Sequence, residues 1–480
     1  MQRAALALAL ACACTPDPPK SSVRFLPCVL GDAAQPRRLH AECATIEVPF
    51  RAGEPRTIPI AIARIGTTGG TPAPDPIVII PGGPGQSASG GFLALQGAFL
   101  EANAKRDVIL VDPRGTGRSH PLDCKSLTRA EYMQRAAASD VPPLALLRTC
   151  AKDMSDDPAA FDTAANVRDL EAVRVALAVE RWNLYGVSYG TRVALAYAKD
   201  HGDRVRAMVL DGVVAPQTIV GRDSDEDADR ALRLLGERCR AQPKCGEAVG
   251  DLEAALTKLH ARLAKPENAR FPHPRTGTPT TARFSASTLV GLARFSLYVP
   301  ELLAPLPWLV KTALASGDVG PLAALAQIQR DGALLAINPW VNLATLCRED
   351  ARAEPEPPNA RTPGFFVDHR EPPLYEVCAA FVAPDPQTRV HEPVASAVPT
   401  LLMSGEADPV TPPAGAELAM KTLAKSKHVV VKGQGHNVIA RGCLPHLAAK
   451  LFETADAAAL DPACVADIAP FPLFTEGAGP

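Results

Sequence analysis

One five-residue stretch constrains this 480-residue chain more than any other, Gly-Val-Ser-Tyr-Gly at 186–190. It follows a strand-like run at 182–185 and precedes a helical pattern at 191–199. A serine on a tight strand-to-helix turn needs small neighbours, because the strained backbone must close, and the turn lifts the hydroxyl clear of the sheet. The stretch therefore predicts a nucleophilic serine, Ser188. The competing interpretation is a structural turn without chemistry.

Short apolar runs alternate with helical patterns around this turn. The strand-like runs lie at residues 58–65, 77–80, 108–111, 400–403 and 429–431. Runs of this kind, bounded by Gly and Pro, are typical of strands buried on both faces of a mostly parallel sheet. Residues 164–179 carry apolar side chains at helical spacing. The alternation predicts an α/β fold, with a mostly parallel central sheet flanked by helices.

The pattern changes between residues 215 and 396. An acidic stretch at 223–229 leads into helical patterns, and proline-rich segments such as 354–358 interrupt the region repeatedly. We expect a mainly helical cap inserted at 215–396 into the α/β fold. The fold itself would then consist of a first part, 23–214, and a second part, 397–480.

Residues 1–22 are predicted to form an export segment and tether. The apolar run at 4–13 has the length of a signal-peptide core and is shorter than the roughly 20 residues of a membrane span. Its end fits either a cleavage site at 11–13 or a bacterial lipoprotein box ending at Cys12. We expect a protein that is secreted, or one anchored in the periplasm or cell envelope by a lipid on Cys12 or Cys14. A misassigned start without export is the alternative.

Ten of the twelve cysteines follow this segment. Their number is even, and none has the spacing of a metal-ligand motif, so we expect no metal site and disulfide bonds formed in an oxidising compartment. The simplest connectivity pairs neighbours in chain order and gives five bridges.

The net charge and the glycine-rich loops indicate which partners and cofactors are not expected. A net charge of −2 provides no field that attracts a polyanion, so a nucleic-acid partner is not expected. The glycine-rich loops at 82–85 and 115–117 lack the lysine of a nucleotide-phosphate loop. We therefore expect no cofactor. The sequence makes no prediction of oligomeric state.

A serine nucleophile needs a base, and the base needs an orienting carboxylate. His436 lies in a glycine-containing loop just after the run at 429–431, and Asp408 follows the run at 400–403. Both therefore lie beyond the carboxyl ends of predicted strands, where such groups assemble. Glu406 is the alternative acid, whereas His428 begins its strand and is expected at the opposite edge. The order Ser, Asp, His is that of the α/β-type hydrolase arrangement.

The loop Pro-Gly-Gly-Pro-Gly at 81–85 follows another predicted strand. Glycines allow backbone N–H groups to approach an oxyanion closely, and each such donor contributes about 3 kcal/mol in the transition state. We predict an oxyanion hole formed by the N–H groups of Gly83 and Tyr189. The alternative is a tight turn with no such role.

Five segments carry a resemblance to a known family: IPGGPGQSA, VDPRGTGRS, GVSYGT, SGEADPVTP and GQGHN occur in this order. The chain resembles the α/β-hydrolase serine peptidases of the proline iminopeptidase type over about residues 40–450. It is most similar to their secreted tripeptidyl-aminopeptidase-like branch. Proline iminopeptidases usually have histidine where this chain has Pro81, and this departure favours the tripeptidyl branch.

The resemblance implies cleavage of peptides near a free N-terminus through an acyl-enzyme at Ser188. Recognition of the substrate ammonium group implies an acid from the cap, and Glu349 and Asp350 resemble the family's position best. The acidic stretch at 223–229 is the alternative. A bridge between Cys347 and Cys378 would stiffen the segment that carries the two acids. An esterase or lipase would use the same three residues, but it would need no acid for an ammonium group.

Overall fold

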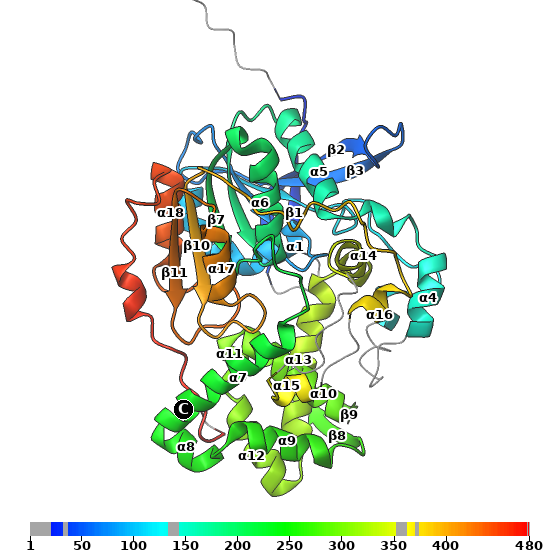
Figure 1. Cartoon of the computed structure of the whole chain (residues 1–480), viewed down its shortest axis with the longest axis vertical. Helices are drawn as coiled ribbons and strands as arrows, with labels where there is room; N and C mark the ends of the chain where they lie inside the picture. Colours follow the sequence, from blue (N-terminus) through cyan, green and yellow to red (C-terminus); the bar gives the residue numbers. More distant parts are fainter. Residues whose placement is uncertain are drawn as a thin grey trace, which may run out of the picture.

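A nine-stranded sheet forms the centre of the molecule (Figure 1). The computed structural model describes residues 21–31, 37–132, 144–351, 362–369, 374–477 and 479. The strand order is β1-β2-β3-β5-β4-β6-β7-β10-β11. Pairing is parallel from β5 through β4, β6, β7 and β10 to β11, and antiparallel among β1, β2, β3 and β5. The predicted α/β fold with a mostly parallel sheet is confirmed.

The strands match the predicted apolar runs closely. The nine strands are β1 (Leu26–Leu30), β2 (Leu39–Pro49), β3 (Thr57–Ile65), β4 (Ile77–Ile80), β5 (Val108–Val111), β6 (Trp182–Val187), β7 (Val205–Asp211), β10 (Thr400–Gly405) and β11 (Ser426–Val431). The apolar runs did not predict β1, β2 or β7. In β1 and β2 most residues are exposed or half-buried, so a continuous apolar signal is missing.

Helices cover both faces of the sheet. One face carries α1 (Ala88–Leu95), α2 (Leu100–Asn103) and α18 (Leu444–Thr454), whereas the other carries α5 (Thr163–Ala176), α6 (Tyr189–His201) and α17 (Pro413–Met420). All four residues of β4 are apolar, because helices cover both faces of this strand. Ile77 and Ile79 pack into the first layer, and Val78 and Ile80 into the second. Successive side chains of a strand point to opposite faces, so a doubly covered strand must be apolar throughout.

The segment between β7 and β10 contains ten helices and a hairpin in its described part. They are α7 (Ser224–Ala241), α8 (Pro243–Val249), α9 (Leu252–Arg262), β8 (Glu267–Pro272), β9 (Pro279–Phe284), α10 (Ala286–Tyr298), α11 (Pro300–Leu303), α12 (Leu306–Ser316), α13 (Gly320–Ala336), α14 (Pro339–Glu349), α15 (Phe365–Asp368) and α16 (Leu374–Cys378). A separate apolar cluster holds α7 to α13 and α15 together. By contrast, Trp340 of α14 and Cys378 of α16 pack into the sheet's own core. The predicted limits of the cap, 215–396, stay a prediction, and the hairpin was not predicted.

Short elements complete the described chain. They are α4 (Leu144–Lys152) and four turns of 3₁₀ helix, η1 (Gln96–Phe99), η2 (Pro158–Ala160), η3 (Gly202–Arg204) and η4 (Ala463–Asp467). Within the described residues, no helix has both the length and the apolar character that crossing a bilayer requires. Most of the predicted export segment, residues 1–20, lies outside the described residues.

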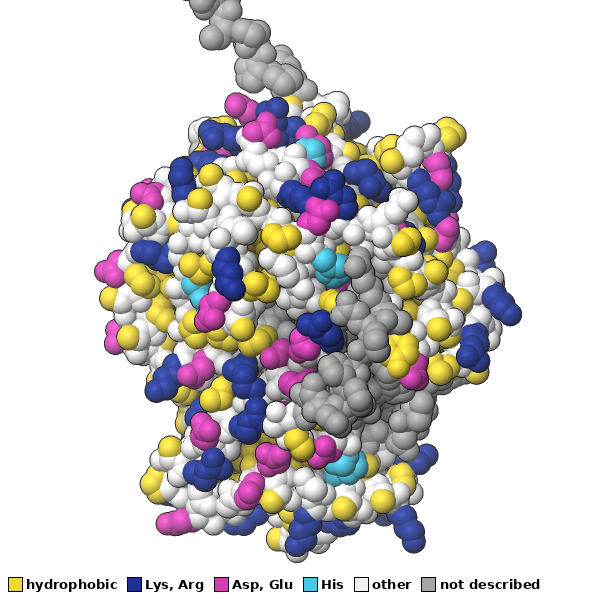
Figure 2. Space-filling view, viewed as in Figure 1, with side chains coloured by type: hydrophobic (Ala, Val, Ile, Leu, Met, Phe, Trp, Pro, Cys, Tyr) yellow, Lys and Arg dark blue, Asp and Glu magenta, His cyan; other side chains and the backbone are white. Residues whose placement is uncertain are grey.

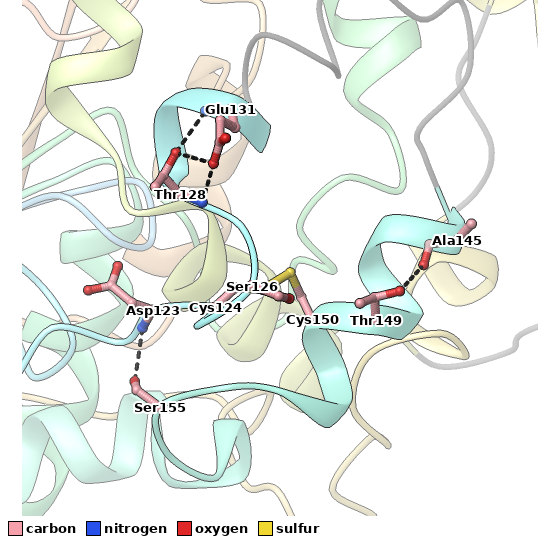
Figure 3. The surroundings of a disulfide bond; sticks show 9 residues. All are labelled: Asp123, Cys124, Ser126, Thr128, Glu131, Ala145, Thr149, Cys150 and Ser155. Atoms are coloured by element: carbon pink, nitrogen blue, oxygen red, sulfur yellow. Dashed lines mark hydrogen bonds between the residues drawn. A yellow bond between two sulfur atoms is a disulfide. The ribbon is translucent and has the colours of Figure 1, made fainter.

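Five disulfide bonds connect neighbouring cysteines in chain order, which confirms the simplest predicted connectivity. The pairs are Cys28–Cys43, Cys124–Cys150, Cys239–Cys245, Cys347–Cys378 and Cys443–Cys464. The second pair attaches α4 to the loop that contains Cys124 (Figure 3). The fourth pair attaches α16 to α14 near the two predicted acids. Each bridge therefore secures a local loop.

Replacing Cys124 and Cys150 together by Ala should lower the free energy of unfolding by about 2–4 kcal/mol, because a 26-residue separation is closed by this bridge. Urea unfolding under oxidising conditions measures the effect. The control is the paired replacement of Cys28 and Cys43, whose bridge closes a shorter loop of 15 residues. This replacement should lower the free energy of unfolding by less. Unchanged stability in the first variant would contradict the bridge.

Candidate active site

Ser188 lies at the turn between β6 and α6, as predicted. Its backbone adopts φ 55° and ψ −127°, a region that L-residues rarely occupy, and its hydroxyl does not cap the helix. The residue is half-buried, whereas its neighbours Val187 and Tyr189 are buried. Its N–H donates a 2.8 Å hydrogen bond to the carbonyl of Asp211 on β7. The strained turn thus turns the hydroxyl away from the packed sheet.

The two glycines around Ser188 allow α6 to lie very close to the strands. A Cβ at Gly190 would lie 2.2 Å from the carbonyl oxygen of Ile80, and one at Gly186 would lie 2.7 Å from the carbonyl oxygen of Gly190. These neighbours are backbone atoms, which cannot move aside like a flexible side chain. Small residues at both positions are therefore a steric requirement of the turn.

The glycine loop at 81–85 lies against Ser188. A Cβ at Gly82 would be 2.9 Å from the Cβ of Ser188, and Gly83 has φ 109°. The first N–H groups of a helix, here including that of Tyr189, have no intrahelical acceptor. Both elements of the predicted oxyanion hole therefore lie beside Ser188, and the role of Gly83 and Tyr189 stays a prediction.

Two asparagines near the start of α14 hold this loop, and the sequence patterns did not reveal them. The N–H of Asn338 donates to the carbonyl of Gly85 at 2.8 Å, and the Nδ2 of Asn342 donates to the carbonyl of Pro84 at 2.9 Å. The loop is therefore tied to a helix more than 250 positions further along the chain.

Asp408 and His436 form a buried pair. His436 Nδ1 lies 2.8 Å from Asp408 Oδ2, and Asp408 is completely inaccessible to solvent. The other carboxylate oxygen, Oδ1, accepts 2.9 Å hydrogen bonds from the N–H groups of Val410 and Thr411. The hydroxyl of Thr411 adds a 2.8 Å bond to Oδ2. Thr411, which the sequence motifs did not single out, therefore fixes the carboxylate that faces the imidazole.

The pair shifts both pKa values in opposite directions. Burial alone would raise the pKa of Asp408, but the charge of His436 and the hydrogen bonds to the carboxylate outweigh burial and lower it. Burial alone would lower the pKa of His436, but the charge of Asp408, its hydrogen bond and the charge of Asp211 raise it above 6.5. The ring is thereby oriented, with Nδ1 engaged by the acid and Nε2 left for other partners.

Residues 211 and 212 connect the turn that carries Ser188 to the ring of His436. The carbonyl of Asp211 accepts the Ser188 N–H, and a Cβ at Gly212 would lie 3.1 Å from His436 Cε1. Ser188, Asp408 and His436 therefore lie at one edge of the sheet, beyond the carboxyl ends of β6, β10 and β11.

The two alternatives among the predicted residues have other positions. His428 lies within β11 and its Nε2 is 2.9 Å from the hydroxyl of the buried Ser404. Glu406 accepts a 2.8 Å hydrogen bond from the N–H of Gly433. It therefore supports the loop that precedes His436, whereas the imidazole pairs with Asp408.

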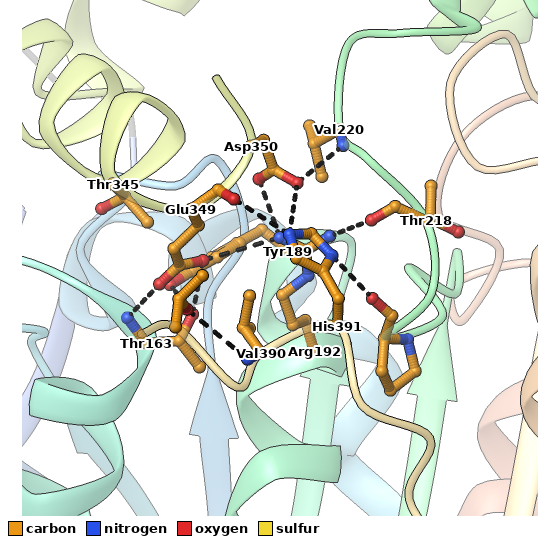
Figure 4. A network of polar contacts seen from close by, with 12 residues as sticks. Thr163, Tyr189, Arg192, Thr218, Val220, Thr345, Glu349, Asp350, Val390 and His391 are labelled. Atoms are coloured by element: carbon orange, nitrogen blue, oxygen red, sulfur yellow. Dashed lines mark hydrogen bonds and ion pairs between the residues drawn. The ribbon is translucent and has the colours of Figure 1, made fainter. Parts of the chain in front are cut away.

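Glu349 and Asp350 are buried in a network of polar contacts around α6 (Figure 4). Arg192 of α6 lies 2.8 Å from Asp350 and 3.5 Å from Glu349. Glu349 also accepts hydrogen bonds from the N–H (2.6 Å) and hydroxyl (3.0 Å) of Thr163. That hydroxyl lies 2.6 Å from the phenol oxygen of Tyr189. These contacts attach the end of α14 to α6, the helix that follows Ser188.

Burial raises the pKa of Glu349 to about 7, with Arg192 opposing the shift and Asp350 adding to it. Both carboxylates already have internal partners. The geometry therefore gives no support to their predicted role with a substrate ammonium group, and that role stays a prediction.

The alternative acidic stretch at 223–229 begins α7, which contacts the Asp408 loop directly. Arg230 donates 2.7 Å hydrogen bonds to the carbonyls of Glu406 and Asp408. Asp229 is buried and accepts two backbone N–H groups of α15. Asp227 is half-buried, and burial raises its pKa to about 7, with Arg230 opposing and the charges of other acids, Asp408 among them, adding to the rise. Figure 2 shows acidic side chains gathered near the middle of one face.

The described residues contain no group of three His, Cys, Asp or Glu side chains arranged to hold a metal ion.

A strained serine between a parallel strand and a helix, with an acid and a histidine beyond later strands, defines an α/β hydrolase. Residues 75–234 match the model of the α/β hydrolase fold family, and residues 367–464 match that of the family described as TAP-like protein.

Three proteins of similar sequence are named as peptidases. Serine protease Hip1 of Mycobacterium tuberculosis is 30% identical over 446 residues, which cover 84% of this chain and 82% of that protein. Tripeptidyl aminopeptidase of Streptomyces coelicolor is 30% identical over 36% of this chain and 35% of that protein. A probable proline iminopeptidase of the same species is 36% identical over 40% of this chain and 49% of that protein. The chain belongs to the α/β-hydrolase family of serine proteases and aminopeptidases, which confirms the predicted resemblance.

Substituting Gly190→Ala should lower kcat/KM by about 100-fold or more, because the new methyl group meets the carbonyl of Ile80 and displaces the turn that carries Ser188. Gly202→Ala is the matched control, since this glycine follows α6 and has no atom within 4 Å of the added Cβ. Steady-state hydrolysis of a chromogenic substrate compares the two. Equal activity in both variants would contradict the steric requirement.

Proposed function

We propose that the protein is an exported serine aminopeptidase in which Ser188 is the nucleophile, His436 the general base and Asp408 the orienting acid. The observation that carries the proposal is the buried 2.8 Å contact between Asp408 and His436, at the same sheet edge as the strained turn of Ser188. A weak hydroxyl nucleophile needs this combination of an adjacent base and a fixed ring orientation.

The reaction would proceed in two displacements. His436 Nε2 takes the proton of the Ser188 hydroxyl while its oxygen attacks the scissile carbonyl, and the N–H groups of Gly83 and Tyr189 stabilise the oxyanion. His436 then gives the proton to the leaving amine, and an acyl-enzyme remains. Water repeats the sequence, releases the N-terminal fragment as an acid and restores the hydroxyl.

The substrate class would be peptides with a free N-terminus. The names of two relatives, tripeptidyl aminopeptidase and probable proline iminopeptidase, support this proposal. An ammonium group requires a carboxylate that a substrate can reach. Asp227 fits better than Glu349 or Asp350, because it is half-buried on the helix that contacts the Asp408 loop, whereas the other two are buried against Arg192. Burial raises the pKa of Asp227 to about 7, and a bound ammonium group would favour its ionised form.

Export is supported by the five disulfide bonds, which persist in oxidising compartments. The predicted segment at 1–22 would direct the chain out of the cytoplasm. A lipid on Cys12 or Cys14 would hold the protein at the periplasmic or cell-envelope membrane, whereas cleavage after the apolar run would release it.

A tripeptidyl anilide with a free N-terminus should be cleaved about 10–100-fold faster than its N-acetylated form, because a charge-assisted contact to the ammonium group is lost on acetylation. Release of the aniline measures both rates. Asp227→Asn should reduce the preference by raising KM for the free form alone, and Ser188→Ala should abolish both reactions. Faster cleavage of the acetylated form would contradict the aminopeptidase and favour the esterase or lipase alternative.

The pH dependence of kcat/KM should show an acidic limb above pH 6.5, because the base must be neutral and Asp408 raises the pKa of His436. Asp408→Asn removes that charge, so the limb should move to lower pH while the rate falls by about 10³–10⁴-fold. Glu406→Gln is the control that should leave the limb in place, since this carboxylate binds Gly433. A limb that Asp408→Asn does not move would contradict the assignment.

A further inference from the structure

Asp211, the last residue of β7, contacts both halves of the candidate site. Its carboxylate is fully buried and accepts three hydrogen bonds, two of them from the loop after His436. The N–H of Val438 donates to Oδ1 at 2.9 Å, the N–H of Ile439 to Oδ2 at 2.9 Å, and the phenol of Tyr185 to Oδ2 at 3.0 Å. Its own carbonyl accepts the N–H of Ser188 at 2.8 Å.

The loop held by this carboxylate has a strained backbone. Asn437, between His436 and the two donors, has φ 65°, and Gly212, which follows Asp211 at the end of β7, has φ 66°. Asparagine tolerates the left-handed region, but only outside contacts keep such a turn in one conformation. Gly212 lies directly beneath the ring, because a Cβ there would approach His436 Cε1 to 3.1 Å.

Because all three partners of the Asp211 carboxylate are donors, both of its oxygens act as acceptors, as in the ionised form. Burial raises the pKa of Asp211, whereas its three hydrogen bonds and the charge of His436 oppose that rise. In its ionised form the carboxylate contributes to the raised pKa of His436.

Among the described residues, the other titratable groups that face the imidazole ring are Asp408 from the loop after β10 and Tyr298 from α10, whose ring lies edge-on at 5.2 Å. The hydroxyl of Thr411 lies 3.0 Å from Nδ1 of the same imidazole. Arg230 of α7 donates to the carbonyls of Glu406 and Asp408.

We propose that Asp211 is a positioning residue for the reaction: it fixes the His436 loop relative to Ser188 and contributes a second negative charge behind the imidazole. The inference rests on the proposed function, in which the base must lie within reach of the Ser188 hydroxyl. Asp211 binds both the N–H of Ser188 and the loop after His436, so it limits the motion of the nucleophile relative to the base. This limit matters because displacing a reacting group by about 1 Å can lower the reaction rate strongly.

Asp211→Asn tests the proposal in the full chain. The amide cannot accept from both backbone donors and carries no charge. We expect kcat to fall about 10–100-fold with KM within about twofold, and the acidic limb of kcat/KM to move about half a unit to one unit lower. Tyr185→Phe removes only the phenol donor, and it should lower kcat about threefold or more, with KM unchanged.

The matched control is Asp75→Asn. Asp75 is another buried carboxylate, paired with Arg106 at 2.8 Å and Arg206 at 3.3 Å, and it precedes β4 at the opposite edge of the sheet. This variant should lower thermal stability while leaving the acidic limb in place. If Asp211→Asn does not fold, as shown by circular dichroism, Tyr185→Phe decides the outcome.

The proposal would be overturned if Asp211→Asn kept the wild-type kcat and an unshifted acidic limb. If only Tyr185→Phe folds, a wild-type kcat in that variant would overturn it. A drop in stability alone, shared with Asp75→Asn, would also overturn it. Failure of the proposed function is a different result: the wild-type protein would then hydrolyse no substrate, or Ser188→Ala would remain active.

Discussion

The close approach of α6 to the end of β4 is the constraint on which the rest of the site depends. Only a residue without a side chain fits where Gly190 faces the carbonyl of Ile80. In the same turn Ser188 has φ 55°, and the glycine loop at 81–85 lies against this residue. The hydrogen bond from Ser188 to Asp211 then links the turn to β7 and, through the Asp211 carboxylate, to the loop of His436. The nucleophile, the oxyanion loop and the base are thus placed by backbone contacts.

Helix α14 supports this arrangement from outside the sheet, although it belongs to the segment between β7 and β10. Its first turn holds the glycine loop through Asn338 and Asn342, and its last turn pairs with Arg192 through two acids. Because Trp340 packs into the sheet's core, the helix acts as part of the α/β unit. The Cys347–Cys378 bridge attaches α16 to it.

Local patterns in the sequence predicted the features that depend on local physics. Buried strands must be apolar on both faces, so the runs at 77–80 and 108–111 were recognisable. The turn at 186–190 was recognisable because glycine is required there. The pairing of neighbouring cysteines was the simplest of many possible connectivities, and the sequence alone does not fix it. Asp408 and His436 could be predicted because each follows a strand whose carboxyl end faces the site.

Features that depend on contacts between distant segments were not predictable in the same way. Nothing near Asn338 or Thr411 shows that one holds the glycine loop and the other orients Asp408. Glu349 and Asp350 form an acidic pair in the sequence, but the partner that neutralises them, Arg192, lies more than 150 residues earlier. The hairpin β8–β9 alternates between buried and exposed residues over only six positions in each strand, which gives a weak signal.

Ser188 is proposed to be a nucleophile that His436 and Asp408 activate. Labelling with a fluorophosphonate, followed by mass spectrometry of the digested protein, tests it most directly, because such a reagent reacts with an activated serine and not with an ordinary hydroxyl. We predict one adduct per chain, located on Ser188, and a large loss of labelling in His436→Ala. An adduct on another serine, or labelling of Ser188 at the same rate without His436, would contradict it.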